Sequence, residues 1–560
     1  TFFTFMLPSS AIDIQQTINS AVASGEHEVL LPTGEHSLDQ LLRLEGLKDF
    51  TIRGDDTTLV FTNLRDCGIL ATDCDGLTLE SLTLDSNPLG FTQGTIETLD
   101  RKSGVVTFKV HDGYPDLASH YLSGRAFAFS PETLNWKKDT PIMYAQKAEA
   151  INPREGRLQF SRGKMATLKT LNVGDYIVLD FRNSRGIRIE RGKNITLKEV
   201  TMWSLPSIGV ISRFMDGDNY FSYTIERGPM PEGAEVPRLL SISADGFNYA
   251  YARKGPIVEN CDFSFMGDDA VNLHGIAFYV AQVKDDMLYL IRPYIGESFT
   301  SIVNSGDVAM SIAPDTFDVK DRAFIQSFEL EPSASKDLLE IAEEIWQSKA
   351  VKSGRISVYA MQVDKHAMSV EAGDFIEIPA IAAPNYTIRN NHFRDHRGRG
   401  LRLMSSNGLV EGNTLENIKQ SAISIGSEMT FYREAGWVEN VTILNNTIRD
   451  VGFDPVMHLS GTHVPGAISL FHRGATPETA RPHMHIRAIN ILRNTIEEVG
   501  GPAIHINQSE DVYVFGNTIS GSNLLSQSST GSDYDLDTTQ PISIDFSKDI
   551  HVYPAPSVNP

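Results

Sequence analysis

The chain has 560 residues, enough for one large domain with insertions or for three or four ordinary domains, and its formal net charge is −22 with 41% hydrophobic and 21% charged residues. This acidic composition argues against binding to nucleic acid or to an anionic membrane surface, and no run of about 18 apolar residues could span a bilayer. The three cysteines exclude a disulfide framework, show no metal-ligand spacing, and leave open whether Cys67 and Cys74 pair.

The N-terminal region predicts a cap for the fold that follows. The apolar start, TFFTFMLPSS, is too short for a full signal peptide and lacks a basic stretch, so it is interpreted as the remnant of a signal peptide or as a segment foreign to the fold. A periplasmic or secreted bacterial protein, with its signal peptide removed, is the matching expectation. From Asp13, DIQQTINSAVASGEHEVLLPTGEH predicts a short amphipathic helix, a strand and a Pro-Gly turn. A helix there would cover the open end of a repeat structure.

Short β-branched segments recur along the rest of the chain. Loose copies begin at Leu77 and Ile195, and clearer copies are VENCDF from Val258, IRNNHF from Ile388, VEGNTL from Val410, ILNNTI from Ile443, ILRNTI from Ile491 and VFGNTI from Val514. The last five copies share an asparagine, at Asn391, Asn413, Asn446, Asn494 and Asn517, and two of the steps between them are 22 and 23 residues. A leucine-rich repeat would need consensus leucines that are absent. The pattern predicts an all-β fold, a right-handed parallel β-helix with coils roughly 4.8 Å apart and the asparagines stacked in an internal ladder.

Two stretches interrupt the repeat and divide the chain. Residues 1–88 are assigned to the cap and the first coils, 181–275 to coils that carry acidic residues, and 380–560 to the C-terminal coils. Residues 89–180 and 276–379 contain alternating strands, and both end in Gly-Asp-aromatic-Ile. Each is predicted to form a small inserted β-barrel. The second also contains a predicted helix in SKDLLEIAEEIWQSKA, from Ser335.

Three aspartates are spaced for proximity on neighbouring coils. Asp245 precedes Asp268 and Asp269 by 23 and 24 residues, about one coil. Glycoside hydrolysis needs two carboxyl groups, one to protonate the leaving oxygen and one to activate water, at ~6.5–9.5 Å in an inverting enzyme. Repulsion between the adjacent acids is expected to keep one of them protonated near neutral pH. The cluster therefore predicts a hydrolytic site, with calcium binding as the main alternative.

The tripeptide Gly-Asp-Asp is weak by itself. It also occurs at Gly54–Asp56, where no partner acid accompanies it and a turn between two strands is expected. The specificity comes from Asp245 one coil earlier and from Asn272 and His274 after the pair.

The run from Ser243 to Gly275, SADGFNYAYARKGPIVENCDFSFMGDDAVNLHG, resembles the glycoside hydrolases of family 110, the β-helical α-1,3-galactosidases. The likeness continues through RGRGLRLMSSNGLVEGNTLENIKQSAISIGSE and REAGWVENVTILNNTI, and it includes the layout with two barrel insertions. Polygalacturonases share the fold and a similar acid arrangement, but their Gly-His-Gly and Arg-Ile-Lys signatures are missing. Gly267 before the acid pair departs from family 110 and is more like a polygalacturonase.

The resemblance implies exo-acting hydrolysis of a terminal α-1,3-linked galactose, with inversion, no metal and no cofactor. Asp268 matches the general acid of the family. Asp245 and Asp269 match the acids that position and deprotonate water, and which of the two is the base stays open.

Further residues are candidates for binding sugar hydroxyls or stacking on a sugar ring. They are Asn272, His274, Arg213, Arg402, Trp203 and Glu434, with Tyr432 and Glu428 as weaker candidates. Core packing or a solvated surface role is the alternative for most of them. The basic group His396, Arg397, Arg399 and Arg402 is unusual in so acidic a chain and predicts contact with an anionic substituent, such as the sulfate of a sulfated galactan.

Two other classes of function stay open at this stage. A pectinase-type hydrolase or polysaccharide lyase has the same fold, although a lyase usually needs a basic proton abstractor and often calcium. A non-catalytic adhesin or spike also uses this scaffold, but it would not need paired acids one coil apart. The expected partner is a carbohydrate substrate, with no nucleic acid and no membrane. The aglycone and the oligomeric state, including a homodimer, are left open.

Overall fold

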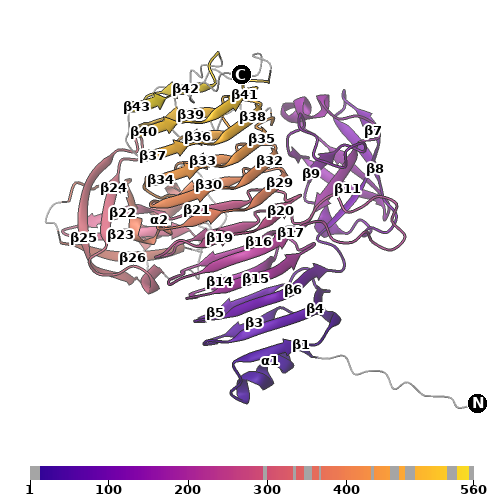
Figure 1. Cartoon of the computed structure of the whole chain (residues 1–560), viewed down its shortest axis with the longest axis horizontal. Coiled ribbons are helices and arrows are strands. Elements are labelled where there is room, and N and C mark those ends of the chain that lie inside the picture. Colours follow the sequence, from indigo (N-terminus) through magenta and orange to yellow (C-terminus); the bar gives the residue numbers. More distant parts are fainter. Residues whose placement is uncertain are drawn as a thin grey trace, which may run out of the picture.

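The chain winds into a parallel β-solenoid that carries two inserted β-structures (Figure 1). The computed structural model describes residues 13–293, 299–331, 336–345, 356–364, 368–429, 434–454, 466–472, 486–525 and 539–553. The apolar start of the chain and Tyr432 lie outside these residues. None of the helices in the described ranges is long and apolar enough to cross a membrane.

Two parallel sheets form the wall of the solenoid. The larger, 19-stranded sheet contains β1 (Glu28–Leu31), β2 (Gly34–Leu38), β4 (Thr51–Phe61), β6 (Thr78–Ser86), β15 (Thr196–Met202), β17 (Tyr220–Ile225), β19 (Ile257–Glu259), β20 (Asp262–Ser264), β28 (Thr387–Arg389), β29 (His392–His396), β31 (Gly408–Glu411), β32 (Thr414–Ile418), β34 (Val438–Leu444), β35 (Thr447–Val451), β37 (Ile486–Leu492), β38 (Thr495–Val499), β40 (Ser509–Phe515), β41 (Thr518–Ser520) and β43 (Lys548–Tyr553). The 11-stranded sheet contains β3 (Leu42–Glu45), β5 (Ile69–Thr72), β14 (Arg185–Glu190), β16 (Ile208–Arg213), β18 (Phe247–Ala250), β21 (Val271–His274), β30 (Leu401–Met404), β33 (Ile423–Ile425), β36 (Ile468–Leu470), β39 (Ile504–Asn507) and β42 (Ile542–Asp545).

The predicted asparagine ladder is confirmed. The side-chain amide of Asn391 donates to the Oδ1 of Asn413 at 2.8 Å, and the same bond continues to Asn446, Asn494 and Asn517 at 2.9, 3.0 and 2.9 Å. Each amide also donates to a backbone carbonyl one coil earlier, as Asn413 does to Ile388. The ladder therefore satisfies buried polar groups where the larger sheet bends between β28 and β29 and between the corresponding strands of later coils.

The helix α1 (Ile14–Ala23) closes one end of the solenoid, below β1 in Figure 1. Asp13 caps it by accepting a hydrogen bond from the Gln16 backbone N–H at 2.9 Å. Ile14, Ile18 and Ala21 turn toward the solenoid and belong to its continuous hydrophobic core. The cap thus keeps the first apolar coil out of water.

The first insertion leaves the solenoid after β6 and returns to it at β14. It is a seven-stranded antiparallel sheet made of β7 (Phe91–Asp100), β8 (Val105–Val110), β9 (Arg125–Phe129), β10 (Met143–Tyr144), β11 (Lys147–Asn152), β12 (Glu155–Gln159) and β13 (Tyr176–Asp180). Its strand order is β10-β9-β13-β7-β8-β12-β11, so β10 and β11 are the outermost strands. The insertion has a hydrophobic core of its own.

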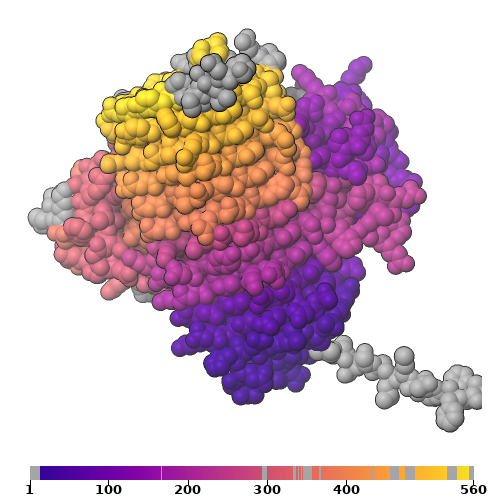
Figure 2. Space-filling view, viewed as in Figure 1, coloured from indigo at the N-terminus to yellow at the C-terminus, as the bar shows by residue number. Residues whose placement is uncertain are grey.

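The second insertion follows β21 and closes into a barrel. The barrel order is β22 (Ala277–Lys284), β23 (Met287–Pro293), β26 (Ile356–Val363), β25 (Val319–Leu330), β24 (Val308–Ile312) and β27 (Phe375–Glu377). The helix predicted in this insertion is α2 (Lys336–Ile345). The two insertions form lobes on opposite sides of the solenoid (Figure 2).

Two local features settle questions that the sequence left open. Cys67, Cys74 and Cys261 are buried free thiols, so Cys67 and Cys74 do not pair. The second Gly-Asp-Asp, at Gly54–Asp56, lies inside the single strand β4, where the pairing register with β6 shifts between Arg53 and Thr57. The expected turn between two strands is therefore wrong, and the segment is an irregularity within one strand.

Candidate active site

The candidate site is built from the same turn on three successive coils. This turn joins the larger sheet to the 11-stranded sheet. Asp245 lies three residues before Asn248 of β18, Asp269 three residues before Asn272 of β21, and Arg399 three residues before Arg402 of β30. Asn248 pairs in register with Asn272, and Asn272 pairs with Arg402. Successive coils therefore form two parallel rows of side chains. One row is Asp245, Asp269 and Arg399, and the other is Asn248, Asn272 and Arg402.

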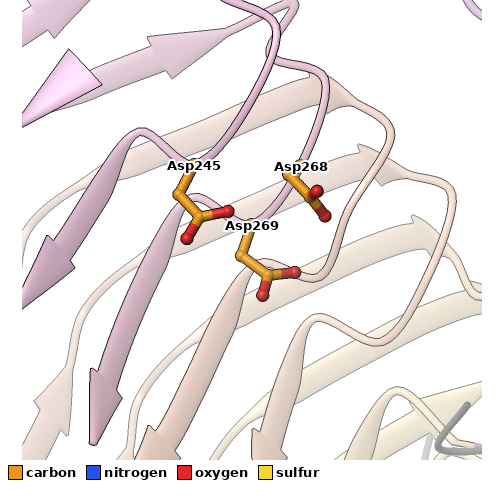
Figure 3. Close-up of side chains that lie close together, drawn as sticks. All are labelled: Asp245, Asp268 and Asp269. Carbon is orange, nitrogen blue, oxygen red and sulfur yellow. The ribbon is translucent and has the colours of Figure 1, made fainter. Parts of the chain in front are cut away.

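The three predicted carboxyl groups come together in the structure. One oxygen from each of Asp245, Asp268 and Asp269 lies within 4.8 Å of the others. Asp245 is on the turn before β18, and Asp268 and Asp269 are on the turn before β21 (Figure 3). Asp268 keeps 25% of its side chain exposed, whereas Asp269 keeps only 2%. Asp268 is therefore the more accessible member of the adjacent pair.

Two arginines from different parts of the chain bind Asp268. Arg397, on the next coil, donates to its Oδ1 at 2.7 Å, and Arg182, at the end of the first insertion, donates to its Oδ2 at 3.2 Å. Burial alone would raise the pKa of Asp268, but the guanidinium groups of Arg397, Arg182 and Arg399 outweigh it and hold this pKa well below its usual range. The ionised form of Asp268 is thus favoured in the free site.

Asp269 forms a bidentate pair with Arg399. The guanidinium Nε and Nη2 donate to its two oxygens at 2.9 and 2.6 Å, and the backbone N–H of Arg399 donates at 2.8 Å. This contact requires close approach of the two coils at Gly398. A Cβ at position 398 would lie 2.2 Å from the carbonyl carbon of Asp268 and 2.4 Å from the backbone nitrogen of Asp269. Gly267 allows a similar approach to the carbonyl of Ser243, 2.4 Å from its would-be Cβ.

Asp245 has the opposite electrostatic environment. Its burial, followed by the charges of Asp268 and Asp269, raises the pKa of Asp245 to about 8. Asn248 donates to its Oδ2 at 2.7 Å, and Arg213 fixes the orientation of that amide by donating to the Asn248 Oδ1 at 2.7 Å. Sequence reasoning placed the protonated acid within the adjacent pair, at Asp268. In the structure the raised pKa belongs to Asp245 instead, because arginines compensate Asp268 and Asp269.

Four of the predicted sugar-binding residues lie beside this cluster. Asn272 is buried on β21, and its Oδ1 has no hydrogen-bond partner among the described residues. His274 is two residues further along β21, its Nδ1 is 2.8 Å from the Gly275 carbonyl, and burial lowers its pKa to about 4. Glu434 lies 3.9 Å from the His274 Nε2 and 3.3 Å from the Nε of the buried Arg402. These groups offer donors and acceptors next to the acids.

The remaining candidates are placed differently from the expectation. Trp203 follows β15, and its indole nitrogen lies 3.4 Å from Glu226, so it packs against the loop after β17. Glu428 is buried and pairs through its backbone with Glu434. Arg213 is bound to Asn248, and Arg397 and Arg399 bind Asp268 and Asp269. The described contacts of these arginines are therefore with groups of the protein itself.

Sequence reasoning missed Arg182 and Asn248. Arg182 lies 86 residues before Asp268 and reaches it only because the first insertion returns to the solenoid at that point. No repeat pattern marks it. Asn248 could have been found, because it occupies the position on β18 that Asn272 occupies on β21.

A bridging cation is disfavoured by the charges in this site. The oxygens of the three acids are close enough to share an ion. However, Arg182, Arg397 and Arg399 already donate hydrogen bonds to Asp268 and Asp269, and their positive charges repel a cation. The arrangement instead suits acid and base chemistry, in which one carboxyl group holds a proton beside ionised neighbours.

Comparison with known proteins agrees with the fold and with the resemblance. Residues 371–476 match the model of the family described as "Right handed beta helix region", which confirms the predicted β-helix. The fold and the acid cluster thus define a β-helix protein with a carboxylate site.

More specific relatives cover most of the chain. An alpha-1,3-galactosidase A of Bacteroides fragilis is 24% identical over 503 residues, 85% of this chain and 75% of that protein. An alpha-1,3-galactosidase A of Bacteroides thetaiotaomicron is 21% identical over 435 residues, 75% of this chain and 70% of that protein. The predicted resemblance to this group is confirmed. Among solved structures, a family 28 exopolygalacturonase of Yersinia enterocolitica is 11% identical with a TM-score of 0.38, covering 94% of this chain and 73% of that one.

Proposed function

We propose that this chain is an exo-acting glycoside hydrolase that releases terminal α-1,3-linked galactose with inversion of the anomeric configuration. The observation that carries the proposal is the group of three carboxyl groups within 4.8 Å on two adjoining coils. Two relatives named alpha-1,3-galactosidase A, which align with 85% and 75% of this chain, support the proposed substrate.

In the proposed mechanism Asp245 and Asp268 share one proton. Two carboxyl groups this close titrate as a pair, so the proton that rests on Asp245 in the free site is available to Asp268. The reactive form carries it on Asp268, which is the more exposed and can protonate the leaving oxygen. Asp245 is then an ionised carboxylate whose high proton affinity makes it the strongest base of the group. Asp245 takes a proton from water, while Asp269 positions that water.

Inversion is proposed although the carboxyl oxygens lie closer than in most inverting pairs. Separations of ~6.5–9.5 Å are usual for inversion and ~5–5.5 Å for retention through a covalent intermediate. A nucleophilic carboxylate needs an unhindered oxygen, but Asp269 accepts three hydrogen bonds from Arg399 and Asp268 is bound by Arg397 and Arg182. Attack by water is therefore favoured over attack by either carboxylate.

An unsubstituted terminal galactose is the proposed substrate, in preference to a sulfated galactan. Arg397 and Arg399, the expected contacts for a sulfate, bind Asp268 and Asp269. Arg402 lies 3.3 Å from the carboxylate of Glu434. A sulfate would have to displace these carboxylates, at the cost of leaving them buried without partners.

The test is hydrolysis of α-1,3-linked galactobiose followed by NMR of the fresh product. The expected first product is β-galactose, and an initial α-galactose signal would contradict inversion. Asp268→Asn is expected to abolish turnover of galactobiose while the protein stays folded. Asp55→Asn, in the other Gly-Asp-Asp, is the matched control and should keep the wild-type rate.

The same experiment separates the alternative functions. Absence of galactose release, together with new double-bond absorbance from pectin or alginate, would indicate a lyase. Wild-type turnover by Asp268→Asn would remove this residue from the acid role.

A further inference from the structure

Arg182 connects the first insertion to both parts of the acid site. It follows β13, and the chain re-enters the solenoid at β14 three residues later. Its Nε donates to the carbonyl of Ser243 at 2.8 Å, and its Nη2 donates to the same carbonyl and, at 3.2 Å, to Asp268. Ser243 belongs to the turn that carries Asp245. One guanidinium group therefore spans the two turns that hold the acids.

Residues of the first insertion hold the Arg182 guanidinium in this position. Its Nε lies 3.7 Å from the Oδ2 of Asp180, the last residue of β13, whose side chain is fully buried. Asp180 in turn accepts a bidentate pair of hydrogen bonds from Arg125 on β9. A planar guanidinium fixed in this way loses little freedom when it binds its targets.

We propose that Arg182 is a positioning residue for the hydrolytic site and that the first insertion delivers it there. Arg182 fixes the distance between the Asp245 turn and Asp268, on which the shared proton depends. The inference rests on the proposed function of the site, and it adds a role for a segment outside the solenoid. Arg182 acts through the groups that it contacts, Ser243, Asp180 and Asp268.

Arg182 is one of several charged groups that face Asp268, and its own contribution to the pKa of Asp268 can be measured from the pH dependence of activity. Around this carboxyl are Asp245 on the preceding coil, Asp269 beside it, and His396, Arg397 and Arg399 on the following coil. Removal of Arg182 takes away one positive charge and leaves the others. The pKa of Asp268 should then rise, and the acidic limb of the kcat/KM profile should move to higher pH.

The experiment compares Arg182→Met, Arg182→Lys and Arg154→Met in the full chain. Arg154 is the matched control, since it is a half-exposed arginine of the same insertion that donates to the Tyr114 and Val110 carbonyls far along the sequence from the acids. We expect Arg182→Met to lower kcat on galactobiose on the order of tenfold to a hundredfold and to shift the acidic limb. Arg182→Lys should return the acidic limb of the pH profile to its wild-type position, because the positive charge is kept. It should restore only part of kcat, because an ammonium group lacks the forked geometry that reaches both the Ser243 carbonyl and Asp268. Arg154→Met should change neither.

An unshifted acidic limb in Arg182→Met, or a kcat loss equal to that of Arg154→Met, would overturn the proposal. Thermal unfolding across pH tests it without any assay of activity. Ionised Asp268 stabilises the fold above the unfolded pKa of the group, and this contribution is lost as pH falls through its depressed folded pKa. The loss of Tm in Arg182→Met should therefore be larger at pH 7 than at pH 3. An equal loss at both would count against the inference even if the wild type proves inactive on galactosides, which would refute only the proposed function.

Discussion

Gly398→Ala is expected to disable the acid site without adding or removing a charge. The new Cβ would lie 2.2 Å from the carbonyl carbon of Asp268 and 2.4 Å from the nitrogen of Asp269. Carbon atoms in van der Waals contact are about 3.5–4.0 Å apart, so the two coils must separate by roughly 1 Å. The neighbours on both sides of residue 398, Arg397 and Arg399, bind the same acids and would move with it.

A displacement of roughly 1 Å in a catalytic group can lower the rate on the order of 100-fold. The strain should cost about 1–3 kcal/mol of stability, typical of overpacking at a buried site, so most of the protein should stay folded. The assay is galactose release from α-1,3-linked galactobiose, with urea unfolding as the measure of stability.

Gly163→Ala is the control, since a Cβ at that position would have nothing within 4 Å. It should keep wild-type activity and stability. If Gly398→Ala hydrolysed galactobiose at the wild-type rate, the close approach of the two turns would not be needed for the site, and the reasoning would fail.

Two further predictions concern the scaffold. Asn413→Ala should destabilise the solenoid by about 3 kcal/mol in urea unfolding, because it removes the oxygen that accepts hydrogen bonds from both the backbone N–H and the side-chain amide of the buried Asn391. Glu377→Gln should reduce the pH dependence of stability. Burial raises the pKa of Glu377 to about 8, so the folded chain retains a proton that the unfolded chain loses, and this group makes wild-type stability fall as pH rises from about 4.5 to about 8.

Both scaffold predictions have matched controls. Asn490→Ala removes a half-buried amide with a single 3.5 Å contact to Thr442, and its unfolding midpoint should stay close to that of the wild type. A loss equal to that of Asn413→Ala would mean that the ladder contributes nothing special. Glu132→Gln changes an exposed glutamate and should keep the wild-type pH slope. If Glu377→Gln keeps that slope as well, another group is responsible for it.

The repeat made the solenoid and the acid cluster predictable. Asn391 and Asn413 recur at one coil length, and the step from Asp245 to Asp268 and Asp269 is close to that length, so strand stacking brings the acids together. The ladder bonds and the 4.8 Å grouping follow from this one period.

The electrostatics of the site depend on contacts that the period does not encode. Arg182, at the end of the first insertion, and Arg399, beyond the second insertion, reach the acids from 86 and 130 residues away. Without them, the repulsion between Asp268 and Asp269 was expected to hold the proton on one of that pair. With them, the proton affinity is highest at Asp245. The prediction of a turn at Gly54–Asp56 was wrong for a related reason. The tripeptide Gly-Asp-Asp does not by itself determine the local structure, which depends on the residues around it.

The second insertion has a consequence for how the site assembles during folding. Asp269 and Arg399 are adjacent in space but 130 residues apart, and the whole barrel lies between them. Within the barrel, Ala277 of the first strand pairs with Glu377 of the last, so its folding brings the entry and exit of the segment side by side. Closing the remaining connection of roughly 30 residues, in place of the full segment, lowers the entropy cost by about 1 kcal/mol. Once folded, the barrel holds the two ends of the intervening segment together and so favours stacking of the coils that carry Asp269 and Arg399.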